Sequence, residues 1–282
     1  MLGRSLESLA QLDYPSYEIV VVDNATEDSE AEEVAGRAGA RYLREPRPGL
    51  SRARNAGVEA AGGELIAFID DDAVAEQEWL HRHADALTDP AVGATTGRIL
   101  PMSSHSSPES QLLDVGDAPL RVDRSNPHWF ELTNFGGLGF GGNMVFKRAV
   151  FESGMRFRES LGVGAPLGGA EELFAFFEIV RDGHAIFYLP QAVVRHESPI
   201  DALPWRGRLA GTRRYSAYLC LLLVEEPEFR RRTLRHIAEA LSHRPRPWRR
   251  PPDDSGRAPR WRVLAEAARG PALYLRSRSH ER

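Results

Sequence analysis

Residues 64–73, Glu-Leu-Ile-Ala-Phe-Ile-Asp-Asp-Asp-Ala, place a short apolar run directly before three consecutive carboxylates. A run of this length that follows glycines is typical of a buried β-strand. Unpaired carboxylates do not stay buried, so we expect Asp70, Asp71 and Asp72 to lie where the strand reaches the surface. In open α/β sheets this is the end at which ligands bind.

The three aspartates predict a cation site. Adjacent carboxylates repel one another, and a hard cation such as Mg²⁺ or Mn²⁺ relieves that repulsion. A metal held by one or two carboxylates keeps open positions for a phosphate-bearing ligand. The alternative is a polar turn that caps the helix expected to follow at residues 76–80.

Length and composition are those of a large α/β domain with an appendage, because the 282 residues are 42% hydrophobic. A single cysteine, Cys220, excludes an internal disulfide and a multi-thiolate zinc site, which indicates a reducing compartment. No apolar run is long enough to cross a bilayer, and the first residues lack the apolar core of a signal peptide. We therefore expect a cytoplasmic protein.

The net charge of −4 is unevenly distributed, with −14 on residues 1–200 and +10 on residues 201–282. A basic tail on an acidic body predicts contact with an anionic surface, either a membrane or a protein. The apolar residues 215–224, beside arginines, favour peripheral membrane contact, and the alternative is packing of this segment on the catalytic domain. No nucleic-acid-binding module is recognisable, so we expect no nucleic acid partner.

Strands and helices alternate along the first half of the chain. Residues 18–22 and 41–44 are expected strands on either side of an Ala/Glu-rich helix, the order found in parallel sheets. A further helix from Ser51 to the glycines at 62–63 has Arg52 and Arg54 in its first turn, where the macrodipole disfavours cations. The pattern hints at a nearby diphosphate, and the alternative is a pair of solvated arginines.

The second half continues with weaker signals. A polar segment, residues 101–135, shows little periodicity and is expected to form a long surface loop. Other expectations are strands at residues 92–100, 144–146, 185–189 and 192–194, helices at 209–224, 228–241 and 260–269, and a disordered Pro/Arg-rich segment at 245–259.

Two glycine-rich loops, around Gly142 and at residues 162–169, and three polar residues complete the candidates. Glycines around Gly142 allow a close approach of the backbone to a ligand, although a flexible loop would have the same composition. Glu171 and Glu172 begin a helix, where they either complement the dipole or include a general base. His196 ends a strand and is either a metal ligand or an ordinary surface histidine.

Taken in order, six motifs resemble the family 2 inverting glycosyltransferases of the GT-A fold, and together they span residues 4–200. They are Tyr14-Pro15 before residues 18–24, then residues 49–57, 63–72, 141–144, 169–172 and 194–196. The resemblance implies a Rossmann-like α/β domain with a mixed, mostly parallel sheet flanked by helices. It also implies a nucleotide-diphospho-sugar donor and a hydroxyl acceptor, which would be a glycan, a lipid-linked molecule or a small molecule.

The resemblance assigns roles residue by residue. Asp23 would bind the nucleobase, Arg54 and Asn55 would lie near the nucleotide, Asp70 would approach the ribose, and Asp72 would hold the Mn²⁺ or Mg²⁺ that bridges the diphosphate. Asp71, Gly142, Asn143 and Glu171 would complete the donor site. Glu172 would be the base that deprotonates the acceptor hydroxyl, and His196 would lie near the metal.

Two departures from the family pattern stand out. The chain begins inside the family's first helix, so the strand normally upstream of it is missing, which implies either a misassigned start or a truncated protein. That loss would expose an apolar edge beside residues 20–22. Glu172 stands where aspartate is usual; the extra methylene moves the carboxylate by about 1.5 Å, and a displacement of about 1 Å can cost on the order of 100-fold in rate.

We therefore expect a GT-A domain at residues 1–200, a helical extension at 201–243 and a partly disordered basic tail at 244–282. Acceptor specificity is expected in residues 101–135 and in the tail. Two alternatives to the transferase stay open: a sugar nucleotidyltransferase of the same fold, and a catalytically impaired binding module that keeps the fold without turnover.

Overall fold

The computed structural model describes residues 1–24, 29–102, 115–196, 205–242 and 260–280. Its strands are β1 (Val20–Asn24), β2 (Arg41–Glu45), β3 (Leu65–Ile69), β4 (Ala73–Ala75), β5 (Val92–Pro101), β6 (Leu120–Val122), β7 (Asn143–Lys147) and β8 (Ala185–His196). Its helices are α1 (Leu2–Leu9), α2 (Glu30–Arg37), α3 (Leu50–Ala60), α4 (Trp79–Leu87), α5 (Trp129–Asn134), α6 (Arg148–Glu152), α7 (Glu171–Arg181), α8 (Trp205–Glu225), α9 (Arg230–Ser242), α10 (Arg260–Ala267) and α11 (Gly270–His280).

The strands form two separate sheets. β1 and β2 pair in parallel, while the larger sheet has the order β3-β7-β5-β8-β4, with β6 also paired to β8. Within the larger sheet only β5 and β8 run parallel, and the other pairings are antiparallel. The structure is thus of the expected α/β class with a mixed sheet, because β4 and β6 run antiparallel to β8, and β7 runs antiparallel to β5.

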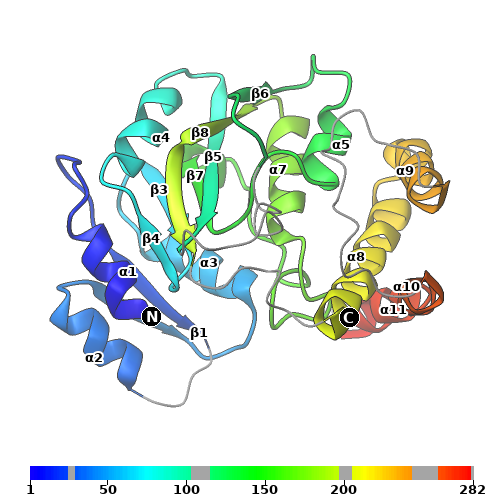
Figure 1. Cartoon of the computed structure of the whole chain (residues 1–282), viewed down its shortest axis with the longest axis horizontal. Coiled ribbons are helices and arrows are strands. Elements are labelled where there is room, and N and C mark those ends of the chain that lie inside the picture. The colour runs from blue at the N-terminus through cyan, green and yellow to red at the C-terminus, as the bar shows by residue number, and fades with distance from the viewer. Residues whose placement is uncertain (25–28, 103–114, 197–204, 243–259, 281–282) are drawn as a thin grey trace.

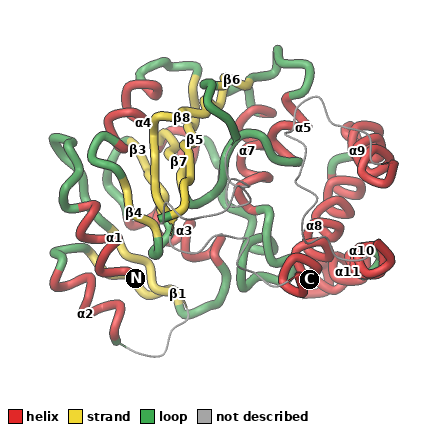
Figure 2. The backbone as a smooth tube through the Cα atoms, viewed as in Figure 1, coloured by secondary structure: helices red, strands yellow, loops and turns green. Residues whose placement is uncertain are grey.

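Helices cover both faces of the larger sheet (Figures 1 and 2). Helices α1 and α4 pack on one face together with β4 and β8, and α3, α5 and α7 lie with the apolar cluster on the other face. Strands β3 and β8 end on the same side of the larger sheet, and the polar residues that follow or end them, Asp70, Asp72 and His196, are partly accessible.

Strand β8 is longer than the sequence predicts. Residues 185–189 and 192–194 were expected to form two separate short strands. Instead, a register shift opposite Gly97 and Arg98 accommodates the intervening residues, so β8 continues from Ala185 to His196. A Cβ on Gly97 would overlap the carbonyl oxygen of Ala192, so this irregularity requires glycine at position 97.

The segment at residues 101–135 is not wholly a surface loop. It contains β6 and the helix α5, in which every residue is buried. A helix that is buried all round shows no amphipathic period, and this explains why the sequence pattern missed it. Residues 103–114 lie outside the described residues.

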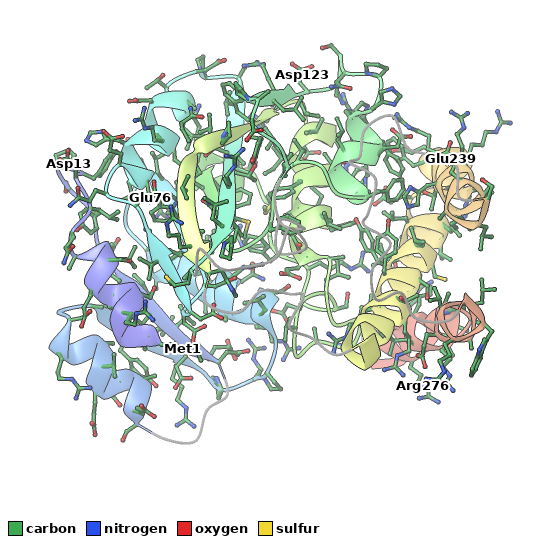
Figure 3. All side chains as sticks on the ribbon, viewed as in Figure 1. Met1, Asp13, Glu76, Asp123, Glu239 and Arg276 are labelled. Atoms are coloured by element: carbon green, nitrogen blue, oxygen red, sulfur yellow. The ribbon has the colours of Figure 1, made fainter. Side chains whose placement is uncertain are left out.

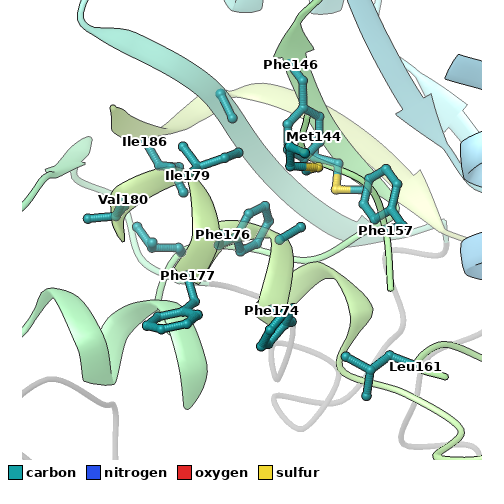
Figure 4. Packing of buried hydrophobic residues seen from close by; sticks show 14 of the residues in the cluster. Met144, Phe146, Phe157, Leu161, Phe174, Phe176, Phe177, Ile179, Val180 and Ile186 are labelled. Atoms are coloured by element: carbon teal, nitrogen blue, oxygen red, sulfur yellow. The ribbon is translucent and has the colours of Figure 1, made fainter. Parts of the chain in front are cut away.

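The largest apolar cluster lies between the larger sheet and α7 (Figure 4). Phe176 of α7 stacks against Phe146 of β7, with ring centroids 6.4 Å apart, and Phe177 of α7 packs against Trp129 and Phe130 of α5. These side chains fix α7 against the sheet, and the first residues of α7 are the two glutamates predicted to be functional.

The C-terminal helices share this core. Tyr218 and Leu221 of α8 and Tyr274 of α11 belong to the same buried cluster as the sheet residues. The expected disordered segment, residues 245–259, lies outside the described residues, whereas residues 260–267 and 270–280 form α10 and α11. Among the described residues no helix is both long enough and apolar enough to cross a membrane.

Candidate active site

Asp70, Asp72 and His196 come together where β3 and β8 end. His196 Nε2 lies 2.9 Å from Asp72 Oδ1 and 3.7 Å from Asp70 Oδ2. Pairing of Ala73 in β4 with His196 in β8 brings the histidine to the aspartates from across the sheet. One ligand atom from each residue lies within 4.8 Å of the others, and all three side chains are partly accessible. Two carboxylates and an imidazole form a donor set suited to a divalent cation.

A tight turn between β3 and β4 orients the aspartates. The Ala73 amide donates to the Asp70 carbonyl at 3.1 Å, and Asp71, in the middle of the turn, faces solvent outside the three-residue group. Gly142 lies against this turn, because a Cβ at that position would overlap Asp70 Oδ2. The glycine therefore leaves room for the Asp70 carboxylate.

The environment of the acidic cluster raises the pKa of Asp72. Burial raises the pKa of Asp72, and the charges of Asp70 and Asp71 raise it further, while His196 opposes both effects. Negative charge that lacks full compensation favours a cation at this site.

Arg54 and Glu171 form a buried ion pair beside the cluster. The Arg54 guanidinium donates to Glu171 Oε1 at 2.6 Å and to the Gly141 carbonyl at 3.1 Å. Its charge also lies over the ring of Phe157, 5.5 Å from the centroid. Arg54 thus links the helices α3 and α7 to the loop that holds Gly142.

The two arginines in the first turn of α3 both have carboxylate partners. Arg52 pairs with Glu159 at 3.0 Å, in addition to the Arg54–Glu171 pair. The anions that offset these cations at the helix N-terminus are therefore protein side chains, an arrangement that local sequence could not reveal.

Glu172 follows Glu171 at the start of α7 and is partly buried. Burial, with a further contribution from the Glu171 charge, raises the pKa of Glu172 to about 8, although Arg54 opposes the shift. Ala170, immediately before the two glutamates, has a left-handed backbone with φ 67°. A non-glycine residue pays on the order of 1 kcal/mol for this conformation, and such strain often accompanies functional positions.

Asn143 occupies the interior, contrary to the expectation of a donor contact. Its Oδ1 accepts hydrogen bonds from Trp79 Nε1 at 2.8 Å and His83 Nε2 at 3.0 Å. Its Nδ2 donates to the carbonyls of Arg98 and Ala192. With every bonding position used, the side chain holds α4, β5 and β8 together and has no capacity left for a ligand.

Asn55 and Asp23 also have intramolecular partners. The Asn55 amide donates to the Phe157 carbonyl and accepts from the Phe157 amide, at 2.8 and 2.9 Å. Asp23, at the end of β1, is 6% exposed and accepts a 2.7 Å hydrogen bond from the Tyr42 hydroxyl. Asn55 therefore fixes the loop beside α3, and Tyr42 orients Asp23.

Comparison with known proteins assigns the chain to a family. The model of the family described as "Glycosyl transferase family 2" matches residues 1–154, more than half of the chain. The chain belongs to glycosyl transferase family 2. The family membership and the α/β fold class inferred from the motifs are thereby confirmed. The match covers Arg54 and the three aspartates but ends before Glu171, Glu172 and His196.

Curated relatives of this family 2 member are similar over part of their length. It is 27% identical to the succinoglycan biosynthesis protein ExoM of Rhizobium meliloti over 73% of this chain and 67% of that protein. It is 24% identical to the putative glycosyltransferase EpsH of Bacillus subtilis over 71% of this chain and 58% of that protein. It is 29% identical to the glycosyltransferase AglE of Haloferax volcanii over 35% of this chain and 34% of that protein. The chain thus spans between one third and two thirds of the length of these relatives.

Solved structures are similar in fold. TarS of S. aureus, residues 1–349, has a TM-score of 0.53 and 19% identity over 77% of this chain and 61% of that one. The same TarS fragment in complex with UDP has a TM-score of 0.52 and 18% identity, again over 77% of this chain and 61% of that one. At this identity the likeness establishes the fold alone.

Proposed function

We propose that this chain transfers a sugar from a nucleotide-diphospho-sugar to an acceptor hydroxyl, with inversion and with a divalent metal. The observation that carries the proposal is the convergence of Asp70, Asp72 and His196 where β3 and β8 end. Membership of glycosyl transferase family 2 supports it. Structures of TarS with UDP and with UDP-GlcNAc, which share the fold, also support a nucleotide-sugar donor.

The residues present fit a Mn²⁺ or Mg²⁺ ion. Asp72 and His196 would hold it, and Asp70 lies close enough to join them or to orient the ligand. Two carboxylates carry the charge such a cation needs, and the raised pKa of Asp72 indicates that the charge is incompletely balanced. When bound, the metal would neutralise the charge that develops on the departing nucleoside diphosphate.

Glu172 is the proposed base. Its carboxylate would accept the proton of the acceptor hydroxyl while the hydroxyl oxygen attacks the anomeric carbon, and the bond to the diphosphate breaks on the opposite face. The buried pair of Arg54 and Glu171 holds the start of α7 and keeps a second negative charge beside Glu172 compensated. The partial burial of Glu172 limits the water that could compete with the acceptor.

The first test is calorimetric titration of the protein with UDP, GDP and TDP, each with and without Mn²⁺. We expect one nucleotide to bind in a metal-dependent manner, and Asp72→Asn to remove the metal dependence. Asp85→Asn is the matched control, because Asp85 is an exposed carboxylate of α4 outside the three-residue group. Equal loss of binding in both variants would contradict the assignment of the metal site.

Donor turnover separates the transferase from a binding module. Metal-dependent binding of the donor without hydrolysis or transfer, in protein shown to be folded, would favour the catalytically impaired binding module. Release of pyrophosphate from a nucleoside triphosphate and a sugar phosphate would instead favour the nucleotidyltransferase.

We also propose peripheral contact of α10 and α11 with an anionic membrane surface. Trp261, Leu264 and Leu275 are 65%, 50% and 66% exposed. Residues 260–280 also contain five arginines against one glutamate, and Arg276 lies on the outer side of this helical group (Figure 3). Exposed Trp and Leu side chains beside cations are the chemistry of interfacial helices.

Vesicle sedimentation tests this contact. We expect binding to vesicles that contain phosphatidylserine and none to pure phosphatidylcholine, with loss of binding at high salt. Trp261→Ser with Leu264→Ser should weaken binding, whereas Leu241→Ser, an exposed leucine on α9, should not. Absence of binding to anionic vesicles at low salt would remove this proposal and leave the transferase proposal intact.

A further inference from the structure

The last residue of α8 connects the C-terminal helices to the segment that leads into α7. Glu225 accepts a 2.9 Å hydrogen bond from the Tyr274 hydroxyl of α11 through its Oε1 atom. Its Oε2 atom pairs with Arg158 at 2.6 Å. Three side chains that are far apart in the sequence therefore form one continuous network, on the side of α8 where α10 and α11 pack (Figure 1).

This network is largely shielded from water. Tyr274 is 3% exposed, and the side chains of Arg158 and Glu225 are 24% and 22% exposed. Burial, with a further contribution from the bond to Glu225, raises the pKa of Tyr274 to about 12, so its hydroxyl keeps its proton and donates. A carboxylate that accepts from a hydroxyl on one oxygen and from a guanidinium on the other is oriented by both. Glu225 therefore fixes the position of Arg158.

Arg158 in turn reaches the first turn of α7. Its guanidinium lies over the ring of Phe174, 5.5 Å from the centroid, and its Nε atom donates to Ser160 Oγ at 3.0 Å. Phe174 comes two residues after Glu172, and its amide donates to the Ala170 carbonyl at 3.1 Å, which closes the first turn of the helix. Arg158 thus contacts the turn that carries the proposed base.

The segment before α7 folds back on itself. The Leu167 amide donates to the Ser160 carbonyl at 2.9 Å. The Gly162 amide donates to the Gly169 carbonyl at 3.3 Å. These bonds close a compact loop, so a shift at its start is passed on to the residue before α7. That residue, Ala170, has the left-handed backbone, a conformation that persists only where the surrounding structure holds it.

A second ion pair joins α8 to the other end of α7. Glu226, the residue after Glu225, pairs with Arg181 at 3.2 Å. Arg181 is the last residue of α7, and at a rise of 1.5 Å per residue it lies about 14 Å along the helix from Glu172. The two neighbouring glutamates therefore make ion pairs at opposite ends of one helix, and only the pair of Glu225 lies beside the proposed base.

We propose that Glu225 and Tyr274 are positioning residues for the transfer reaction. They fix Arg158, which holds the first turn of α7 and with it the carboxylate of Glu172. This role rests on the proposed function, in which Glu172 is the base, and it gives the C-terminal helices a part in turnover that is separate from contact with a membrane. A partly exposed ion pair adds little to the free energy of unfolding, so its loss should affect turnover more than stability.

Turnover of UDP-GlcNAc in the presence of Mn²⁺ tests this role, with water as the acceptor and UDP release as the signal. Glu225→Gln and Tyr274→Phe should each lower kcat by about tenfold or more, because a displacement of about 1 Å can cost on the order of 100-fold in rate. KM for the donor should stay within about twofold, since the network does not include the candidate metal ligands. Glu225→Asp keeps the charge and should recover part of kcat. The matched control, Glu226→Gln, should turn over as the parent does.

Hydrogen exchange gives a readout that does not require turnover. The amides of Phe174 and Leu167 close the first turn of α7 and the loop before it. They should exchange about tenfold faster in Glu225→Gln and Tyr274→Phe than in the parent, and at the parent's rate in Glu226→Gln. Unchanged protection of the ladder between β5 and β8 shows that each variant is folded.

The two measurements separate this role from the proposed function. Unchanged exchange at Phe174 and Leu167 in both variants would overturn the positioning role. Faster exchange with an unchanged kcat would overturn it too, as would an equal loss of kcat in Glu225→Gln and Glu226→Gln. If the parent releases no UDP while exchange responds as expected, the result counts against the proposed function, and the link between α11 and the start of α7 is supported.

Discussion

Arg54 and Glu171, 117 residues apart in the chain, form a 2.6 Å ion pair in which both side chains are more than 90% buried. The pair joins α3 to the first residue of α7. Because α7 begins with Glu171 and Glu172, the position of the proposed base depends on a contact with α3, a helix that is distant in the sequence.

Arg54→Met should therefore destabilise the protein by about 3–5 kcal/mol, because it leaves Glu171 as an unpaired charge in the interior. Adding Glu171→Gln should recover about 2 kcal/mol of that loss, since the neutral amide no longer requires a partner. The free energies of unfolding, measured by urea titration for the single and double variants, check this coupling. Additive losses would mean that the two side chains do not interact in solution.

The pH dependence of transfer should reflect Glu172. A base must be deprotonated, and the pKa of Glu172 is raised to about 8, so kcat/KM should increase with pH and level off above about 8. Glu172→Gln should lower kcat by about 10²–10⁴-fold while nucleotide binding is retained. A profile that is flat between pH 6 and 9 would argue that another group accepts the proton.

Glu172→Asp tests whether this site is built around the longer side chain. Shortening the residue withdraws the carboxylate, and we expect a loss in kcat on the order of 100-fold. An increase in kcat would instead show that glutamate impairs turnover at this position. It would favour the alternative of a catalytically impaired protein.

Gly142→Ala should weaken metal binding with little effect on the fold. The added methyl group meets the end of the Asp70 side chain, which can move away, so the change in unfolding free energy should stay below about 1 kcal/mol. Displacing that carboxylate should lower Mn²⁺ affinity by about 10–100-fold, as calorimetry would show. Gly36→Ala, in open space on α2, should instead stabilise the protein by roughly 0.5–1 kcal/mol and leave Mn²⁺ binding unchanged.

Acid should destabilise the protein through His83. Burial lowers its pKa from 6.5 to about 4, so the unfolded chain binds the proton more readily than the folded one. The neutral imidazole contributes fully above pH 6.5, and about 3 kcal/mol of stability is lost as the pH falls from there to 4. Unfolding free energies of the parent and His83→Gln should converge towards pH 4. His81→Gln, on the accessible part of the same helix, should track the parent.

Local sequence was sufficient to place the candidate metal ligands at the ends of their strands, which is where the structure has them. The aspartates after β3 and the histidine that ends β8 were recognised from an apolar run that stops at polar residues. The pairing of Arg54 with Glu171 could not be recognised, because it depends on the packing of two distant helices. The prediction for Asn143 failed for a related reason. A polar side chain beside glycines suggests a ligand site, yet Trp79 and His83 hydrogen-bond the Asn143 side chain in the interior.

Strand β8 gives the molecule an uneven resistance to local opening. It bonds to β4, β5 and β6, whereas among the described residues β1 forms a ladder with β2 alone. We expect amides in the centre of β8 to exchange only on global unfolding, and those of β1 and β2 to exchange through a smaller, more frequent opening. His196 would then sit on the most persistent unit of the fold and Asp23 on the least, so any ligand that contacts both would stabilise the weaker unit most.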